Sequence, residues 1–170
     1  MKMTDSKSKE FRILAIAPSV HTVGFAVLHD RHTLADWGLK NIEGKKNTSS
    51  LSIVEHLIGT YEPDVLVFED VHATGARRSP RIQELLKQID AMAKGRKLAV
   101  RTFGRQQVVV TIVPEGEQTK HAVAEVVAGK FPEQLATLVP PKRKPWQGEN
   151  YQMPMFEALA LALTFVKKGK

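Results

Sequence analysis

Three short apolar runs follow one another near the amino end of this chain, with only a few residues between them. They are RILAIA at 12–17, VGFAVLH at 23–29 and TLADWGLK at 33–40. Connections this short suit antiparallel strands, whereas parallel strands need a longer crossover. Asp30 and Arg31, between the last two runs, suit a tight hairpin. The sequence therefore predicts a three-stranded meander.

Helical and strand patterns alternate after the meander. The segment 64–68 (DVLVF) has no polar face, which indicates a strand buried on both sides. The other expected elements are a strand at 97–103 and helices ending near 61 and covering 79–95, 104–113, 119–128 and 153–167. Expected helix caps are Ser49 or Ser50 (after a loop at 44–49), Ser79 and Thr119, and expected stops are Gly95 and Gly129. This order predicts an α/β fold with a mixed five-stranded sheet, in which the meander is followed by βαβ units and flanked by helices.

The length and composition fit one globular domain. The chain has 170 residues, 42% of them hydrophobic, and no cysteine, which excludes disulfides, thiolate zinc sites and thiol catalysis. Its first ten residues are polar, and no apolar run reaches the ~20 residues that a membrane helix needs. We expect a flexible N-terminal arm at 1–11, a single domain at 12–168, a cytoplasmic location and no membrane partner.

The net charge of +7 is concentrated in two segments. Residues 70–110 carry nine Lys and Arg against three acids, and residues 140–150 carry three against one. An excess of this kind favours a polyanionic partner such as nucleic acid, and the alternative is an ordinary solvated surface.

Acidic residues stand at two places where a carboxylate is informative. Glu69 and Asp70 follow the buried strand, at the strand end where α/β sheets bind ligands. Glu157 is the one charged residue between Met153 and Val166 in an otherwise apolar helical segment. Such a carboxylate must be paired, hold a cation or lie at an edge in water. Converging carboxylates are the ligands of Mg²⁺, which supports phosphodiester hydrolysis. The alternative is a solvated strand end and helix edge.

Three motifs carry a family resemblance. They are ILAIAPSVHTVGFAVL at 13–28, VLVFED at 65–70 and FEALALAL at 156–163. With the element order, they resemble RuvC-type Holliday-junction resolvases, which have the ribonuclease H-like fold. Pro18 and Gly24 keep the family's places in the first motif, and Glu69 and Glu157 match the acids of the other two. The resemblance implies a homodimeric endonuclease acting on branched DNA, with Mg²⁺ held by Glu69 and Glu157, Asp70 as a further acid, and a metal-bound water as nucleophile.

Some positions depart from the family pattern. Ala17 stands where the family has the Asp that bridges two metals, and Ser19 replaces a Gly. The turn before Glu157 offers Met153, Pro154 and Met155 where the family has another acid or His, and position 157 is Glu where Asp is usual. An alanine at 17 also results when an enzyme is inactivated by design, although the other losses favour natural divergence. Such a site should hold a metal pair poorly.

The basic segments supply the candidate nucleic-acid contacts. They are Arg77, Arg78 and Arg81 after the Glu69 strand, and Lys142, Arg143, Lys144 and Trp146 in the segment before the last helix. Guanidinium and ammonium groups bind phosphates, and a Trp ring can stack on a base. The alternative for each group is a solvated loop or helix start.

Three functions therefore remain open at this point. The first is a magnesium-dependent endonuclease that acts on branched DNA. The second is a catalytically inactive nucleic-acid-binding module with the same fold, supported by Ala17. The third is a small relative of the actin-like sugar kinases, which is disfavoured because those proteins need two such domains around the nucleotide.

Overall fold

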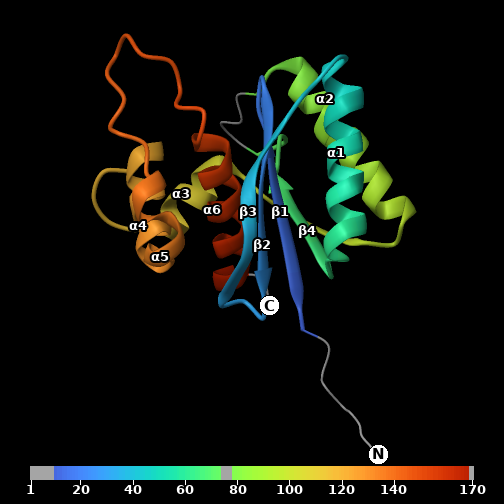
Figure 1. Cartoon of the computed structure of the whole chain (residues 1–170), viewed down its shortest axis with the longest axis horizontal. Coiled ribbons are helices and arrows are strands. Elements are labelled where there is room, and N and C mark those ends of the chain that lie inside the picture. The colour runs from blue at the N-terminus through green and yellow to red at the C-terminus, as the bar shows by residue number, and fades with distance from the viewer. Residues whose placement is uncertain (1–9, 74–77, 169–170) are drawn as a thin grey trace, which may run out of the picture.

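Five strands form one mixed sheet in the order β3-β2-β1-β4-β5, in a computed structural model that describes residues 10–73 and 78–168 (Figure 1). The strands are β1 (Arg12–Pro18), β2 (Thr22–His29), β3 (Thr33–Asn41), β4 (Val65–Glu69) and β5 (Ala99–Phe103). β1 pairs antiparallel with β2 and parallel with β4, β2 pairs antiparallel with β3, and β4 pairs parallel with β5. The predicted α/β fold is confirmed, with the meander placed before the βαβ units.

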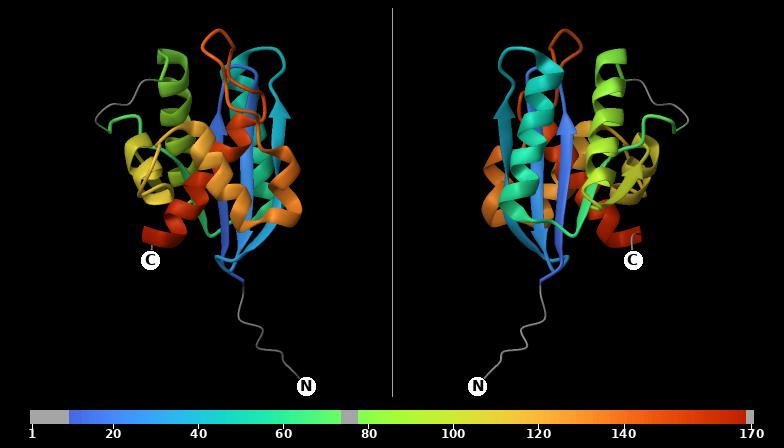
Figure 2. Two further views of the ribbon diagram at one scale, coloured as in Figure 1. Left: turned by 90° about the vertical axis from the view of Figure 1, so that its left-hand side faces the viewer. Right: turned by 90° about the vertical axis from the view of Figure 1, so that its right-hand side faces the viewer.

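Helices cover both faces of this sheet (Figures 1 and 2). The helical elements are α1 (Lys46–Tyr61), α2 (Pro80–Gly95), α3 (Arg105–Ile112), α4 (Lys120–Lys130), α5 (Pro132–Leu135), the short 3-10 helix η1 (Ala136–Leu138) and α6 (Met153–Lys168). α1 and α2 lie on one face, and α6 lies on the other with α3, α4 and α5 on its outer side (Figure 1). Among the described helices, none combines the length and apolar character needed to cross a bilayer.

β1 separates two hydrophobic cores because its side chains alternate between the faces of the sheet. Leu14 and Ile16 pack with α1 and α2, while Ile13, Ala15 and Ala17 pack with α6 and its neighbours. All five side chains are buried. Each large aliphatic side chain buried in this way contributes about 2 kcal/mol relative to exposure. The central strand therefore has apolar residues at every position from Ile13 to Pro18, as a strand covered on both faces requires.

The hairpin between β2 and β3 turns at the predicted residues. Asp30 and Arg31 have φ angles of 53° and 72°, in the left-handed region. Positive φ at two successive turn residues matches the right-handed twist of the flanking strands. The backbone N–H of Phe11 donates to Asp30 Oδ1 at 3.0 Å, and the Phe11 ring stacks on Phe165. Phe11, the last residue of the expected N-terminal arm, is thus attached to the sheet, and residues 1–9 lie outside the described part.

Two predicted helix ends were wrong. α1 begins at Lys46, so residues 46–49 of the expected loop are helical. Ser50 lies inside this helix and is buried, and Ser49 Oγ accepts from the backbone N–H of Glu43 at 3.1 Å, so neither caps the helix. No side chain caps this start, and Asn47 in the first turn exchanges hydrogen bonds with Arg81. α4 continues through Gly129 to Lys130, because a glycine is tolerated within a helix that tertiary contacts hold.

Gly24 allows α6 to begin very close to the sheet. A Cβ at position 24 would lie 2.3 Å from the carbonyl carbon and oxygen of Pro154 and 2.6 Å from the amide nitrogen of Met155. These atoms are backbone, so they cannot rotate away as a side chain would. Gly24 pairs with Ala17 across β1 and β2, which places the first turn of α6 directly over this pair.

We predict that Gly24→Ala lowers the free energy of unfolding by about 1–3 kcal/mol, because the added methyl group overpacks the contact between β2 and α6. Chemical denaturation measures the change. The matched control is Gly59→Ala in α1, where no described atom beyond the adjoining residues and the local helix backbone lies within 4 Å of the added carbon. That control should be neutral or stabilising by up to about 1 kcal/mol. Equal stability of the two variants would contradict the close approach.

Candidate functional site

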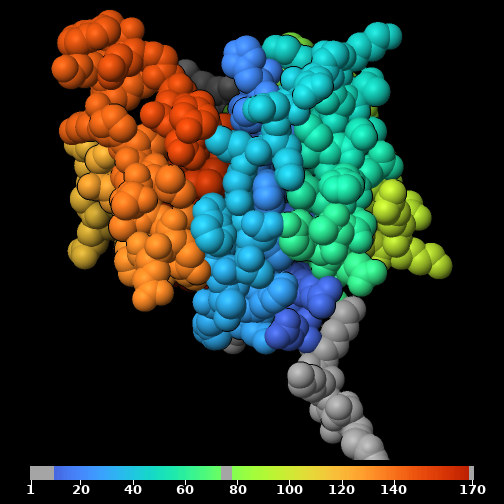
Figure 3. Space-filling view, in the orientation of Figure 1, coloured from blue at the N-terminus to red at the C-terminus, as the bar shows by residue number. Residues whose placement is uncertain are grey.

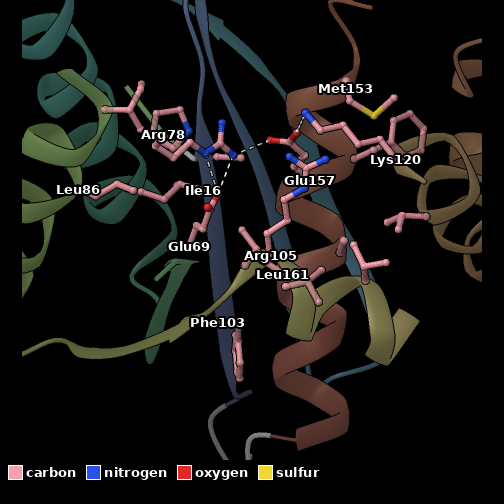
Figure 4. Close-up of a pocket in the computed structure, with 18 residues that line it drawn as sticks. Ile16, Glu69, Arg78, Leu86, Phe103, Arg105, Lys120, Met153, Glu157 and Leu161 are labelled. Atoms are coloured by element: carbon pink, nitrogen blue, oxygen red, sulfur yellow. Dashed lines mark hydrogen bonds and ion pairs between the residues drawn. The ribbon is translucent and has the colours of Figure 1, made fainter. Parts of the chain in front are cut away.

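A cleft with a charged rim opens where β1, β4 and the first turns of α6 meet (Figure 4). β1 contributes Ala17, β4 ends at Glu69, and Glu157 lies one turn into α6. The rim also includes Arg78, Arg105 and Lys120, and the remaining lining residues are mostly apolar side chains of α2, β5, α3 and α6. The two acids singled out from the sequence thus face the same cleft.

Arg78 lies between the two carboxylates and contacts both (Figure 4). Its Nε donates to Oε1 of Glu69 at 2.8 Å, and its Nη2 forms an ion pair with the same oxygen at 2.7 Å. The same Nη2 donates to Oε1 of Glu157 at 3.3 Å. Glu157 and Arg78 are 79 positions apart in the sequence. A single guanidinium therefore joins the end of β4 to α6.

Lys120, the first residue of α4, holds the second oxygen of Glu157. Its Nζ lies 2.9 Å from Glu157 Oε2 and also pairs with Glu149. Glu149 belongs to the segment that precedes α6, so Lys120 joins α4, α6 and that segment. We call Glu69, Arg78, Lys120 and Glu157 the acid–cation cluster. The side chains of Glu69 and Glu157 are only 11% and 17% exposed, so water screens these pairs weakly.

The cluster shifts the pKa of two of its members. Burial alone would raise the pKa of Glu157, but the charges of Lys120 and Arg78 outweigh burial and hold that pKa below its ordinary value. Burial alone would lower the pKa of Arg78, but Glu157 and Glu69 outweigh it and hold that pKa above its ordinary value. Both groups are therefore charged at neutral pH.

The described residues do not fit the magnesium pair implied by the resemblance. Within the described part of the chain, no group of three or more His, Cys, Asp or Glu side chains is placed to hold a metal ion. The two facing carboxylates already accept from Arg78 and Lys120. Position 17, where the resemblance implies a bridging Asp, presents a buried methyl group. Mg²⁺ needs several free oxygen ligands in octahedral geometry, which this set does not offer.

Other predicted site residues lie apart from the cluster. Asp70 is outside the cleft lining, and its Oδ1 accepts from the backbone N–H of His72 at 2.9 Å. Arg81 donates to Asn47 Oδ1 at 2.9 Å and to the carbonyl of Ser19 at 3.0 Å, so it ties α2 to α1 and to the β1–β2 turn. Arg77 lies outside the described residues. The roles of these three residues in catalysis or phosphate contact stay predictions.

The basic segment 140–150 stands at the end of the sheet where α6 begins (Figures 1 and 3). Lys144 Nζ lies 5.4 Å from the centre of the Trp146 ring, which is 77% exposed. Lys142 lies 3.5 Å from Glu117 with both side chains largely exposed. Lys142 and Arg143 line a groove between this segment and the start of α4, and Trp146 stands near it in the same segment.

Sequence reasoning missed Lys120 and Arg105. Lys120 occupies the first position of α4, immediately after the Thr119 cap, where the helix dipole disfavours a cation. A lysine in that position indicates a nearby carboxylate, and this signal was available in the sequence. Arg105 begins α3, and its side chain is directed toward the rim of the cleft (Figure 4).

Solved structures resemble this chain, although no family model and no curated protein matches it. A Thermus thermophilus RuvC structure matches with a TM-score of 0.64 at 16% identity, covering 94% of this chain and 97% of that one. T. thermophilus RuvC in complex with Holliday junction substrate matches with a TM-score of 0.63 at 16% identity, covering 94% of this chain and 96% of that one. The yeast mitochondrial Holliday junction resolvase Ydc2 matches with a TM-score of 0.56 at 13% identity, covering 92% of this chain and 78% of that one. The chain has the RuvC-like, ribonuclease H-like fold. The resemblance drawn from the motifs is thereby confirmed for the fold.

We predict that Glu157→Gln lowers stability at neutral pH and that the deficit shrinks in acid. The folded pKa of Glu157 lies below its ordinary value of 4.5, so its ion pairs stabilise the protein above that pH and are lost as pH falls further. Near pH 7 the loss should be about 1–3 kcal/mol in the free energy of unfolding. Denaturant titrations between pH 7 and pH 3 measure both trends.

The control for this experiment is Glu55→Gln. Glu55 pairs with Arg96 at 3.3 Å, and both side chains are nearly half exposed. Solvent screening should keep its effect below about 1 kcal/mol. A deficit for Glu157→Gln that stays constant across this pH range would contradict the role of its ion pairs.

Proposed function

We propose that this protein binds branched DNA through the end of the sheet that carries the acid–cation cluster, and that it binds without cutting. The observation that carries the proposal is the basic groove beside the cluster. The RuvC-like fold supports the DNA assignment, since T. thermophilus RuvC with this fold is known in complex with Holliday junction substrate.

The groove is formed by the start of α4, the start of α3 and the segment 140–150. Its positively charged or titratable members are Arg105, Lys120, His121, Lys142 and Arg143, and its acidic member is Glu149. Arg105, Lys120 and Met153 line both the groove and the cleft, so the two depressions adjoin. A phosphate backbone lying in the groove would therefore run past the acid–cation cluster.

The charges in this region suit phosphate contacts. Arg143 is exposed, and Lys142 makes only a solvent-exposed pair with Glu117, which a phosphate can replace at little cost. Contacts of Lys and Arg with phosphates release counterions, which makes binding strongly dependent on salt. Trp146, largely exposed in the same segment, offers a face on which an unpaired base at a branch point can stack.

A homodimer is part of the proposal. A four-way junction presents two equivalent strands related by a two-fold axis, and a two-fold dimer would place one basic groove on each. Support for this state comes from the resemblance to RuvC-type resolvases. Sedimentation analysis of the protein alone and with a junction tests it, with two chains per junction as the expected stoichiometry.

The rival function is magnesium-dependent cleavage of the same substrate. Glu69 and Glu157 favour it, because they face each other across the cleft. The pairing of both with Arg78, and the methyl group at position 17, favour binding alone. Incubation of a labelled four-way junction with Mg²⁺ separates the two functions. Cleavage that disappears in Glu69→Gln would establish the nuclease and overturn binding without cutting.

We predict that replacing Lys142, Arg143 and Lys144 together by Ala weakens binding of a four-way junction about tenfold or more near 0.1 M salt. The slope of log K against log salt should become shallower by about 0.9 for each phosphate that the variant no longer neutralises. Fluorescence anisotropy over a range of salt concentrations measures both quantities.

The matched control replaces three exposed cations away from the groove, Lys87, Lys130 and Lys168. Lys130 and Lys168 end the helices whose first residues line the groove, so they lie at the opposite end of those helices. This control removes the same net charge. If it weakens binding as much as the groove variant does, the attraction is general and the groove is not the binding surface.

A further inference from the structure

Arg78 makes the contacts that a bridging cation would make between Glu69 and Glu157. We infer that Arg78 is a built-in replacement for a divalent cation, which lets a phosphate approach the two acids with no metal present. This inference rests on the proposed function, because it concerns how the same surface accepts DNA. It assigns to Arg78 a role beyond the phosphate contact expected from the sequence.

The geometry supports replacement because one guanidinium contacts both acids. Nη2 lies 2.7 Å from Glu69 Oε1 and 3.3 Å from Glu157 Oε1, so the two carboxylates share a single charged nitrogen. Nε adds a hydrogen bond to Glu69 at 2.8 Å. A metal ion entering between these oxygens would have to displace Arg78 and break charge-assisted hydrogen bonds on both sides.

The charges of the acid–cation cluster balance without any ion. Glu69 and Glu157 carry two negative charges, and Arg78 and Lys120 carry two positive charges. Arg78 pairs with both acids and Lys120 pairs with Glu157, each within 3.3 Å, and Lys120 also pairs with Glu149 outside the cluster. Two carboxylates without these partners would repel a phosphate and would raise one another's pKa. Arg78 therefore removes the repulsion that a metal ion would otherwise have to neutralise.

Arg78 also keeps hydrogen-bonding capacity for a ligand. Its bonds to the two acids use Nε and Nη2, and no described residue accepts from Nη1. The side chain is 26% exposed at the rim of the cleft, and Nη1 is the nitrogen that we assign to a phosphate oxygen. Because Glu69 and Glu157 hold the guanidinium in place, little side-chain entropy is lost when a phosphate binds.

The first experiment measures junction binding with and without Mg²⁺ at constant ionic strength. The wild-type protein should bind equally, within about twofold, in EDTA and in millimolar Mg²⁺. Arg78→Ala should bind about tenfold more weakly in EDTA, because it removes the cation between Glu69 and Glu157 and leaves Lys120 as the one cluster cation facing two acids. Mg²⁺ should restore much of the loss. Arg105→Ala is the control, because it removes a cation from the same rim and leaves both acids paired. Its loss should be the same in both conditions.

The second experiment measures metal binding by the protein alone. Electron paramagnetic resonance with Mn²⁺ should show no site of sub-millimolar affinity in the wild-type protein and one such site in Arg78→Ala. Arg78→Ala combined with Glu157→Gln should lose that site again. Arg78→Gln, which preserves much of the side-chain length and packing, should behave as Arg78→Ala does, so the test stands if the smaller side chain impairs folding.

The outcomes separate this inference from the proposed function. A Mn²⁺ site in the wild-type protein that disappears in Glu157→Gln would overturn the inference, as would Arg78 variants that fold and gain no site. Failure of the wild-type protein to bind a junction would overturn the proposed function, and the Mn²⁺ measurements would still decide whether Arg78 replaces a metal.

Discussion

The contact between α6 and the sheet is the constraint on which the rest of the structure depends. α6 is buried along most of its length. Its apolar side chains pack against β1 and β2, and this contact is what removes them from water. Its first turn can reach the sheet only because Gly24 has no Cβ. The close packing of this turn sets how far Glu157 lies from the end of β4. It therefore allows Glu157 to contact Arg78, which follows Glu69 in the chain. A packing requirement in the core thus determines the geometry of the charged site.

The second constraint is that a carboxylate on a buried helix needs cationic partners. Glu157 is 17% exposed, so its charge needs partners, and two elements supply them from opposite sides. Arg78 comes from the segment before α2, and Lys120 comes from the first turn of α4. Lys120 sits against the dipole of its own helix, an unfavourable position that Glu157 and Glu149 offset. The ion pairs therefore have a structural role, since they join α4, α6 and the start of α2 around one end of the sheet.

Most of the fold was predictable from the sequence because local patterns carry it. The apolar run in β4, the apolar residues of β1 and the Ser79 and Pro80 start of α2 each depend on neighbouring residues. The convergence of Glu69 and Glu157 followed from the motifs. What could not be predicted depends on tertiary contacts. α1 starts without a serine cap, with Asn47 of its first turn bonded to Arg81, and one partner of Glu157 lies 79 positions away. The sequence indicates only a phosphate contact for Arg78, because it shows a basic residue near an acid but not which way its side chain turns.

The methyl group at position 17 and the guanidinium at 78 both affect the balance of charge in the cleft, so their effects depend on one another. A third carboxylate at position 17 would face Glu69 and Glu157 with no cation of its own, and Ala17 is buried, so its charge would be poorly solvated. Three acids at this place require more positive charge than Arg78 and Lys120 provide, which divalent ions supply in a metal-dependent site. With alanine at 17, two acids and two internal cations balance, and a metal would compete with an arginine that is already held by hydrogen bonds. The alanine at 17 and the presence of Arg78 therefore act together, and an aspartate at 17 would not by itself create a metal site while Arg78 occupies the space between the two acids.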